Sequence, residues 1–341
     1  MAPVTNARVI FSKVPEGIPQ PGTTTCDTSE TIDIENVPLQ GGFLVKTLVV
    51  SIDPYLRNLM VAPGTKSLLP TYTLGQPLMS YGVGVVVRSD CRDMKAGDHV
   101  YGTLPHQQYF VQKDLADLRV LDNTHRLPWS TFVGAAGMPG QTAFYGWKEF
   151  SHATRGETVF VSGAAGAVGS FIIQLAKMDG LKVIASAGSD EKVEFVKQLG
   201  ADVAFNYKEV DTAKVLAENG PINIYWDNVG GPTLDAALEA ATQHARFIEC
   251  GQISGYNTGG APVKNLMNVV TKCISMNGFM VTSLEKKYVE EFYRVVPEQI
   301  AKGKIRHREQ VFEGLQNVEE VLRRVLKGET QGKAVVQVAT K

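Results

Sequence analysis

Two tyrosines have a residue type and a setting suited to acting on a small molecule. Tyr256 lies in a glycine-rich stretch, residues 251–260, which follows a predicted strand at 245–250. Open α/β sheets bind ligands beyond the carboxyl ends of their strands, and a phenol hydroxyl there can donate to an oxygen that gains negative charge during a reaction. Tyr55 follows an Asp-Pro pair that favours a turn. For both tyrosines the alternative is structural, with the ring half-buried and its hydroxyl bonded to backbone.

A turn of small residues has the features of an anion-binding site. The segment Thr158–Ser170, TVFVSGAAGAVGS, reads as a strand, a turn without large side chains and the start of a helix. Small residues let a diphosphate approach the backbone, and the N–H groups and dipole of the helix N-terminus stabilise its charge. Ala164 stands where the G-x-G-x-x-G fingerprint has its first glycine, and a tight turn without a ligand is the alternative. The residues expected to hold a dinucleotide are Gly163, Ala164, Ala165, Gly166, Ala167, Val168 and Gly169.

The residues after the next predicted strand distinguish between two dinucleotides. An NAD site usually carries Asp or Glu about 20 residues beyond the glycines, but no acid ends this strand. Gly188, Ser189 and Lys192 follow it instead, and Tyr207 comes after a third strand. A hydroxyl, an ammonium and a phenol favour the 2′-phosphate of NADP. The alternative is that one of the two acidic residues between Ser189 and Lys192 contacts a ribose hydroxyl. Lys192 could also be a solvated helix residue without a ligand contact.

The pattern of predicted secondary structure changes after about residue 125. Before it, short β runs such as 43–52, 82–87 and 99–101 are separated by turns containing Pro or Gly, which indicates a mostly β domain. From about 155, strands alternate with helices, which predicts a parallel sheet covered on both faces. The tail 332–338 reads again as a strand and is expected to return to the first domain. The later predicted strands are 158–162, 182–185, 203–205, 222–226 and 245–250, and the helices are 167–178, 190–199, 211–219, 232–242 and 286–302.

Composition excludes several classes of function. The 341 residues carry a formal net charge of -1, which gives no general attraction to nucleic acid or anionic membranes. No apolar run approaches the ~18 residues needed to span a bilayer, and the N-terminus does not read as a signal peptide. The four cysteines form no CxxC pair, so we expect reduced thiols in a cytoplasmic protein. The six histidines show no metal-ligand spacing, and we expect no metal.

Motifs along nearly the whole chain resemble medium-chain dehydrogenases/reductases. More narrowly, the chain is similar to the zinc-free group of leukotriene dehydrogenases, prostaglandin reductases and plant alkenal double-bond reductases. The motifs are SIDPYLR (Ser51–Arg57), GMPGQTAF (Gly137–Phe144), SGAAGAVGS (Ser162–Ser170), GSDEK (Gly188–Lys192), FNYK (Phe205–Lys208), DNVGG (Asp227–Gly231), CGQISGYN (Cys250–Asn257) and GKAVV (Gly332–Val336).

The resemblance implies a fold and an activity. It implies a mostly β, GroES-like catalytic domain from residues 1–125 and 305–341, and a Rossmann NADP-binding domain with a doubly wound parallel sheet from 126–304. It also implies NADPH-dependent reduction of the carbon–carbon double bond of α,β-unsaturated aldehydes or ketones. Hydride would reach the β-carbon while a donor stabilises the enolate. Such enzymes are commonly homodimers.

The same resemblance assigns roles to individual residues. Tyr256 and Tyr55 match tyrosines that face the substrate. Relatives often carry Asn two residues before the glycine of the terminal GK, whereas this chain has Thr330, which puts that cofactor contact in doubt. The other residues that match cofactor contacts are Lys192, Ser189 and Tyr207 at the 2′-phosphate, then Asn228, Thr142 and the segment Phe279–Val281, with Phe279 and Val281 beside the nicotinamide.

Other functions fit part of this pattern. A zinc-free NADPH quinone reductase of the same superfamily would share the cofactor site, and some relatives oxidise secondary alcohols. A non-catalytic NADPH-binding protein would keep the turn of small residues without turnover, since a fold does not imply an activity.

Overall fold

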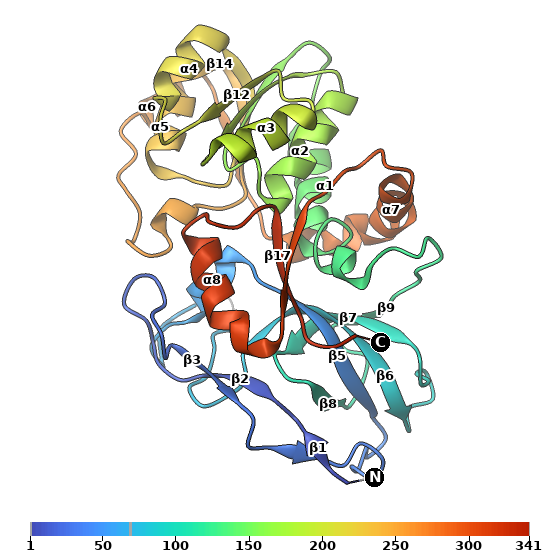
Figure 1. Ribbon diagram of the computed structural model, residues 1–341. Coiled ribbons are helices and arrows are strands. Elements are labelled where there is room, and N and C mark those ends of the chain that lie inside the picture. Colours follow the sequence, from blue (N-terminus) through green and yellow to red (C-terminus); the bar gives the residue numbers. More distant parts are fainter. Residues whose placement is uncertain (1, 68–69, 341) are drawn as a thin grey trace. The chain divides into compact units, whose positions relative to one another are not determined.

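The computed structural model describes residues 2–67 and 70–340. The chain divides into two compact units, one formed by Met1–Gly134 with Glu309–Lys341 and the other by Ala135–Arg308. Figure 1 shows the first unit containing both blue and red segments, because it is built from both ends of the chain. The second unit is continuous in sequence.

The first unit is organised around a seven-stranded sheet in the order β16-β17-β5-β6-β7-β9, with β8 paired to β5. The C-terminal strand β17 (Lys333–Gln337) pairs antiparallel with β5 (Phe43–Ser51), which is buried along almost its whole length. The other strands are β6 (Met79–Ser89), β7 (His99–Pro105), β8 (Tyr109–Gln112), β9 (Leu118–Val120) and β16 (Glu309–Glu313). Two small sheets pair β1 (Val4–Thr5) with β4 (Thr31–Ile32) and β2 (Arg8–Phe11) with β3 (Thr24–Asp27).

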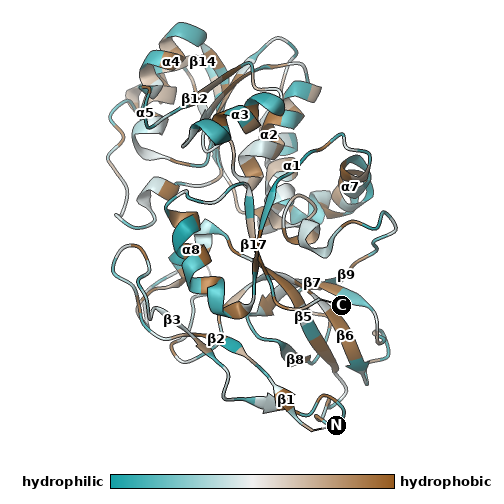
Figure 2. Cartoon of the chain, viewed as in Figure 1, coloured by the Kyte–Doolittle hydropathy of each residue, from teal (hydrophilic) through white to brown (hydrophobic). Residues whose placement is uncertain are grey.

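A C-terminal helix covers part of the core of this unit. In α8 (Val318–Leu326), the apolar residues Val318, Val321 and Leu322 recur at helical spacing and are buried. Brown and teal alternate along this helix in Figure 2, as expected for an amphipathic element. Its apolar side chains share one core cluster with residues of β17 and of the 3-10 helix η1 (Pro54–Leu59). None of the helices predicted from the sequence covers α8.

The second unit contains a six-stranded parallel sheet in the order β12-β11-β10-β13-β14-β15. The strands are β10 (Thr158–Val161), β11 (Lys182–Ala187), β12 (Val203–Asn206), β13 (Ile222–Asp227), β14 (Ala241–Glu249) and β15 (Ser275–Gly278). The helices are α1 (Met138–Phe150), α2 (Ala167–Met178), α3 (Asp190–Gln198), α4 (Thr212–Asn219), α5 (Gly231–Ala240), α6 (Met267–Thr271) and α7 (Val281–Ala301). The chain order reverses between β10 and β13, which is where doubly wound sheets bind ligands.

Local chemistry explains how this unit begins its helices and fills its core. Ser189 and Asp211 cap α3 and α4 by accepting main-chain N–H bonds from the first helical turns. Phe160, Tyr225 and Phe247 pack across neighbouring strands, with ring centroids 5.1 and 5.2 Å apart. Aromatic pairs at these separations add to the stabilisation from burial.

The expected fold class is confirmed, and several boundaries shift. The expected helix 167–178 coincides with α2. The expected helix 232–242 ends at Ala240, because the chain continues directly into β14, and the expected helix 286–302 begins earlier, at Val281. The helix α1 was not assigned from the sequence.

The unit boundaries also lie later than the expected 125/126 and 304/305. The structure divides at Gly134/Ala135 and Arg308/Glu309. The short helix η2 (Trp129–Val133) packs on β5, β6 and β17, so it stays with the first unit. No helix within residues 2–67 and 70–340 is both long and apolar enough to cross a bilayer.

Candidate functional site

The small-residue turn after β10 leads to the unbonded main-chain N–H groups of a helix start. In the turn itself, the N–H groups of Ala164 and Gly166 donate to the carbonyls of Ser186 and Gly163. Gly163 has a φ of +57°, a backbone conformation that favours glycine. A Cβ on Gly169 would lie 2.7 Å from the Cα of Ala164, so only glycine lets α2 pack this closely on the turn. Gly166 is the N-cap of α2 and has no side chain to cap it. The first turn of α2 therefore fits a diphosphate.

Buried hydrogen bonds fasten this turn to the end of β13. Asp227 Oδ1 accepts from the hydroxyls of Ser162, at 3.1 Å, and Tyr225, at 2.8 Å. The same oxygen accepts from the main-chain N–H groups of Val229, at 2.7 Å, and Gly230, at 2.8 Å. One carboxylate oxygen thus fixes both the residue before the glycine turn and the loop after β13.

Asn228 is expected to contact the cofactor, and its side-chain amide also links the glycine turn to the end of β13. Its Nδ2 donates to the carbonyl of Ser162 at 2.6 Å, and its Oδ1 accepts from the indole of Trp226 at 3.2 Å. Asn228 Cβ also lies 3.4 Å from where a Cβ on Gly163 would be. The residue is therefore beside the turn and fixes its shape.

The residues expected at a 2′-phosphate gather beyond the carboxyl ends of β11 and β12. A Cβ on Gly188 would meet the hydroxyl of Tyr207 at 3.0 Å, so the phenol lies directly over this glycine. Ser189 Oγ accepts from the N–H of Lys192 at 3.4 Å, which brings the lysine to the first turn of α3. Burial and the nearby Lys208 lower the pKa of Lys192. Two cations in one place suit a phosphate dianion.

The two acidic residues that could have contacted a ribose have other partners. Asp190 Oδ1 accepts from the side-chain amide of Asn206 at 3.3 Å. Glu191 forms an ion pair with Arg308 at 3.2 Å. Because both carboxylates are engaged, these contacts favour a site for the 2′-phosphate over a carboxylate contact to a ribose hydroxyl.

Tyr256 lies beyond the end of β14, at the same edge of the sheet. It ends the short helix η3 (Ile253–Gly255). Its hydroxyl comes within 3.0 Å of the position that a Cβ on Gly251 would occupy. The glycine thus makes room for the phenol, and the carbonyl of Asn228 lies 3.9 Å from the same position. The structure brings Tyr256 to the edge that carries the glycine turn.

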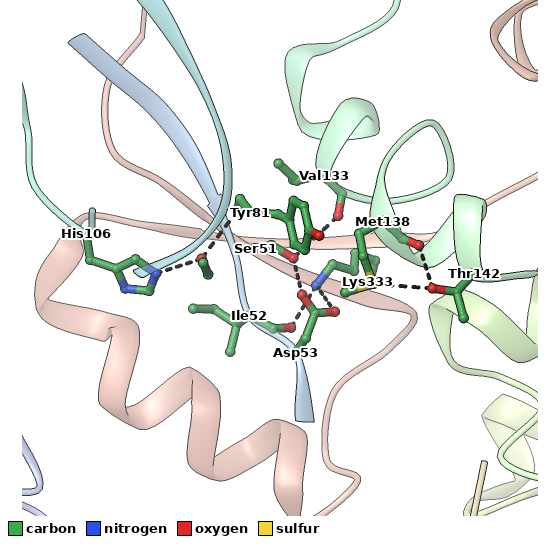
Figure 3. Close-up of polar contacts among 10 residues, drawn as sticks. Ser51, Ile52, Asp53, Tyr81, His106, Val133, Met138, Thr142 and Lys333 are labelled. Carbon is green, nitrogen blue, oxygen red and sulfur yellow. Dashed lines mark hydrogen bonds and ion pairs between the residues drawn. The ribbon is translucent and has the colours of Figure 1, made fainter. Parts of the chain in front are cut away.

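Two other expected cofactor residues, Phe279 and Thr142, have engaged side chains, and a third, Val281, begins a helix. Phe279 packs with Trp226, at 6.0 Å between ring centroids, and fills a notch that Gly146 leaves in α1. Val281 is the first residue of α7. The Thr142 hydroxyl donates to the carbonyl of Met138 at 2.8 Å, within its own helix (Figure 3).

The first unit positions Tyr55 next to a buried ion pair. Lys333 Nζ donates to Asp53 Oδ1 at 2.9 Å and to the carbonyl of Ile52 at 2.7 Å (Figure 3). Asp53 is the N-cap of η1 but makes no capping bond, because its carboxylate turns to Lys333 and to the Ser51 hydroxyl. Burial and the Asp53 charge raise the pKa of Tyr55, which keeps its phenol protonated.

The ion pair was not anticipated from the sequence. Both partners lie in motifs that carry the family resemblance, Asp53 in SIDPYLR and Lys333 in GKAVV, and that shared membership is the signal by which the sequence marks them. Thr330 is buried on the segment that leads into β17, three residues before Lys333. Asp227 was also missed, although it opens DNVGG.

A buried histidine in the first unit does not serve as an acid or base near neutral pH. His106 Nε2 lies 2.7 Å from Ser80 Oγ. Burial lowers the pKa of His106 to about 3, so its ring stays neutral.

Comparisons with known proteins decide the family. A family model described as the N-terminal domain of oxidoreductase matches residues 7–120, and one described as zinc-binding dehydrogenase matches 167–298. The chain is 37% identical to a 2-alkenal reductase (NADP(+)-dependent) of Nicotiana tabacum, over 98% of each chain. It is also 37% identical to a (+)-pulegone reductase of Mentha piperita, over 88% of each. The chain belongs to the medium-chain dehydrogenase/reductase family, in the group of alkenal reductases.

A solved structure agrees with this assignment. This medium-chain reductase superposes on CurA from Vibrio vulnificus in complex with NADPH with a TM-score of 0.89 and 29% identity, covering 98% of this chain and 100% of that one. The resemblance read from the motifs is therefore confirmed.

The name of one family model raises the question of zinc. Across the described parts of this medium-chain reductase, no group of three or more His, Cys, Asp or Glu side chains is arranged to hold a metal. Zinc independence stays a prediction, which elemental analysis of the purified protein would test.

Proposed function

We propose that this enzyme uses NADPH to reduce the carbon–carbon double bond of α,β-unsaturated aldehydes and ketones. The chain is an NADP-dependent oxidoreductase, and NADP(H) is its cofactor. The observation that carries the substrate class is the full-length similarity to the tobacco 2-alkenal reductase, supported by the similarity to the pulegone reductase. The cation and hydroxyl groups of Lys192, Ser189 and Tyr207 support the 2′-phosphate contact.

Tyr256 is the proposed donor to the substrate. The bound cofactor supplies the hydride for the β-carbon. Because hydride addition moves negative charge onto the carbonyl oxygen, a phenol hydroxyl aimed at that oxygen stabilises the transition state more than the bound substrate. Gly251 gives this hydroxyl its room beyond β14.

Tyr55 is the second hydroxyl proposed to face the substrate. The turn at Asp53 and Pro54 sets its direction, and the Lys333–Asp53 ion pair holds that turn. The raised pKa of Tyr55 means that its phenol keeps its proton and can donate a hydrogen bond throughout the neutral range. Protonation of the α-carbon is left to either tyrosine or to water.

A substrate panel tests the proposed activity. NADPH consumption would be followed with short alkenals, cyclic enones, phenylpropenals and quinones, and the products identified by mass spectrometry. We expect the saturated aldehyde or ketone. Turnover of quinones alone would support the quinone reductase alternative, and cofactor binding without consumption would support a non-catalytic role.

A homodimer in the cytoplasm is part of the proposal. The strand β15 is the last in its sheet, and an unpaired edge can pair with a second copy. Leu266, Met267 and Val270 are exposed on or beside α6, which directly precedes β15. All four cysteines are free, as in a reducing compartment. Light scattering after gel filtration would give the mass, and a monomer at micromolar concentration would contradict a homodimer.

A further inference from the structure

A buried carboxylate holds the cofactor turn, yet only one of its oxygens is bonded. Asp227 is fully buried, and its Oδ1 carries the four bonds described above. Its Oδ2 is also buried and has no hydrogen-bond donor among the described residues. A buried polar atom without a partner costs free energy, so the second oxygen needs an explanation.

Glu249 lies next to that oxygen. It is the last residue of β14 and is the register partner of Asp227 on the neighbouring parallel strand, so the two side chains point to the same face. Both carboxylate oxygens of Glu249 are buried and lack a donor as well. If Glu249 carries a proton, one hydrogen bond from its carboxyl group to Asp227 Oδ2 provides a partner for two of these three oxygens.

Among the described residues, no cation acts on Glu249 in place of that proton. Within residues 2–67 and 70–340, Asp227 is the one charged group that acts on Glu249. Burial, together with the charges of Asp227 and Glu249, raises the pKa of Tyr225 and of Cys250. On the far side, the register partner of Glu249 is Gly278 of β15, which has no side chain. The helical layer over this face contributes Leu234 of α5, within the apolar cluster that contains Tyr225.

Two buried carboxylates without a counter-charge cannot both ionise cheaply. Burial and the Asp227 charge raise the pKa of Glu249 to about 8. At neutral pH Glu249 is therefore the partner that carries the proton, and Asp227, whose Oδ1 already has four donors, accepts it through Oδ2.

We propose that Glu249 is a positioning residue for the cofactor: its carboxylic acid donates to Asp227 Oδ2, and loss of that proton loosens the turn that receives the diphosphate. This inference rests on the proposed NADPH binding. When Glu249 ionises, two anions repel each other beneath the loop 228–230, and a second negative charge lies near the site of another anion. Cofactor affinity is then expected to fall above about pH 8.

The test measures cofactor affinity against pH. The dissociation constants of NADPH and NADH would be measured by fluorescence from pH 6.5 to 9.5 for the wild-type protein and for Glu249→Gln. Gln keeps the shape and can donate to Asp227 without titrating. For the wild type, we expect the constant for both cofactors to rise above pH 8, by up to about tenfold per pH unit. For Glu249→Gln, we expect no such rise with NADH.

NADH separates Glu249 from Lys192, whose lowered pKa also affects 2′-phosphate binding at alkaline pH. A matched control is Glu218→Gln, an exposed carboxylate on α4, which should keep the wild-type profile. A wild-type NADH profile that stays flat, or a Glu249→Gln profile that still rises, overturns the inference while leaving NADPH binding intact. Absence of binding at every pH removes the proposed function itself.

Thermal unfolding without cofactor gives a second readout. The melting temperature of the wild type is expected to fall relative to Glu249→Gln as the pH rises from 6 to 8, because in this range the folded state holds a proton that the unfolded state has already lost. If Glu249→Gln does not fold, the wild-type NADH profile decides alone: a rise supports the inference and a flat profile overturns it.

Discussion

Each unit of the molecule buries an aspartate near the end of a strand, and the two sites handle the charge differently. In the first unit, Asp53 is matched by the ammonium of Lys333, which is 4% exposed. In the second, Asp227 has hydrogen-bond donors on one oxygen and the carboxyl group of Glu249 at the other. One site is neutralised by a cation and the other by a proton. The two sites should therefore respond differently to mutation and to pH.

Removing the cation should have the largest effect. Lys333→Met leaves Asp53 charged, buried and without its partner, which costs about 3–5 kcal/mol in comparable cases. We expect a corresponding loss in the free energy of unfolding, measured in urea by circular dichroism. The double variant Lys333→Met/Asp53→Asn should recover part of it. Equal stability of the single and double variants would contradict a role for the charge.

The next largest effect compares the two tyrosines, one from each unit. Tyr256→Phe removes the proposed donor to the developing enolate, and losing such a donor typically lowers kcat by ~10²–10³. Turnover of an enal would be measured at saturating NADPH. Tyr55→Phe is the matched variant in the first unit and is expected to lose less. A Tyr256→Phe rate within a factor of three of the wild type would exclude the proposed role.

A smaller effect should separate the two cofactors. Lys192→Ala removes an ammonium from the 2′-phosphate site, and a charge-assisted contact of about 1.5–3 kcal/mol corresponds to roughly 10–100-fold in affinity. The KM for NADPH should rise by that factor, while the KM for NADH stays within about twofold. Lys208→Ala tests the neighbouring cation in the same assay. Equal changes for both cofactors would remove Lys192 from the phosphate site.

The smallest effect is the pH dependence of stability. The pKa of Glu249 is about 8 in the folded protein, above its usual value of 4.5, so the folded state binds the extra proton between these values. Its contribution is complete below 4.5 and is lost as the pH rises toward 8. From pH 6.5 to 7.5 the wild type should lose about 1 kcal/mol relative to Glu249→Gln. Burial lowers the pKa of Lys333, so its contribution changes in the opposite direction, increasing as the pH rises toward 10.5.

Local patterns in the sequence predicted most of the second unit. Strand, small-residue turn and helix occur in consecutive residues, so the start of α2 at Ala167 could be assigned correctly. The alternation of strands and helices also predicted the parallel sheet. In these cases the determining contacts are close in sequence.

Other features depend on contacts that are distant in sequence. The helix α1 contains Gly140 and Gly146, which lower helix propensity. The structure needs both, because a Cβ on Gly140 would lie 1.9 Å from the carbonyl of Ala135 and one on Gly146 would meet Phe279. The pairing of Lys333 with Asp53 joins residues 280 positions apart. The acid form of Glu249 depends on a neighbouring strand. By contrast, the apolar spacing of α8 is local, since Val318, Val321 and Leu322 recur within five residues.

The place of β17 has a consequence for how the protein is made. This strand lies inside its sheet, between β16 and β5, and carries Lys333 to Asp53. A ribosome delivers residues 333–337 after β5 and after the whole unit 135–308, so β5 and its carboxylate wait through that stretch of synthesis for their partner. The continuous unit 135–308 can fold earlier, since domains generally fold as units during synthesis. A chain truncated before residue 333 would therefore contain a complete unit 135–308. In its other unit, β5 would lack the neighbouring strand β17, and the buried Asp53 would lack its lysine partner.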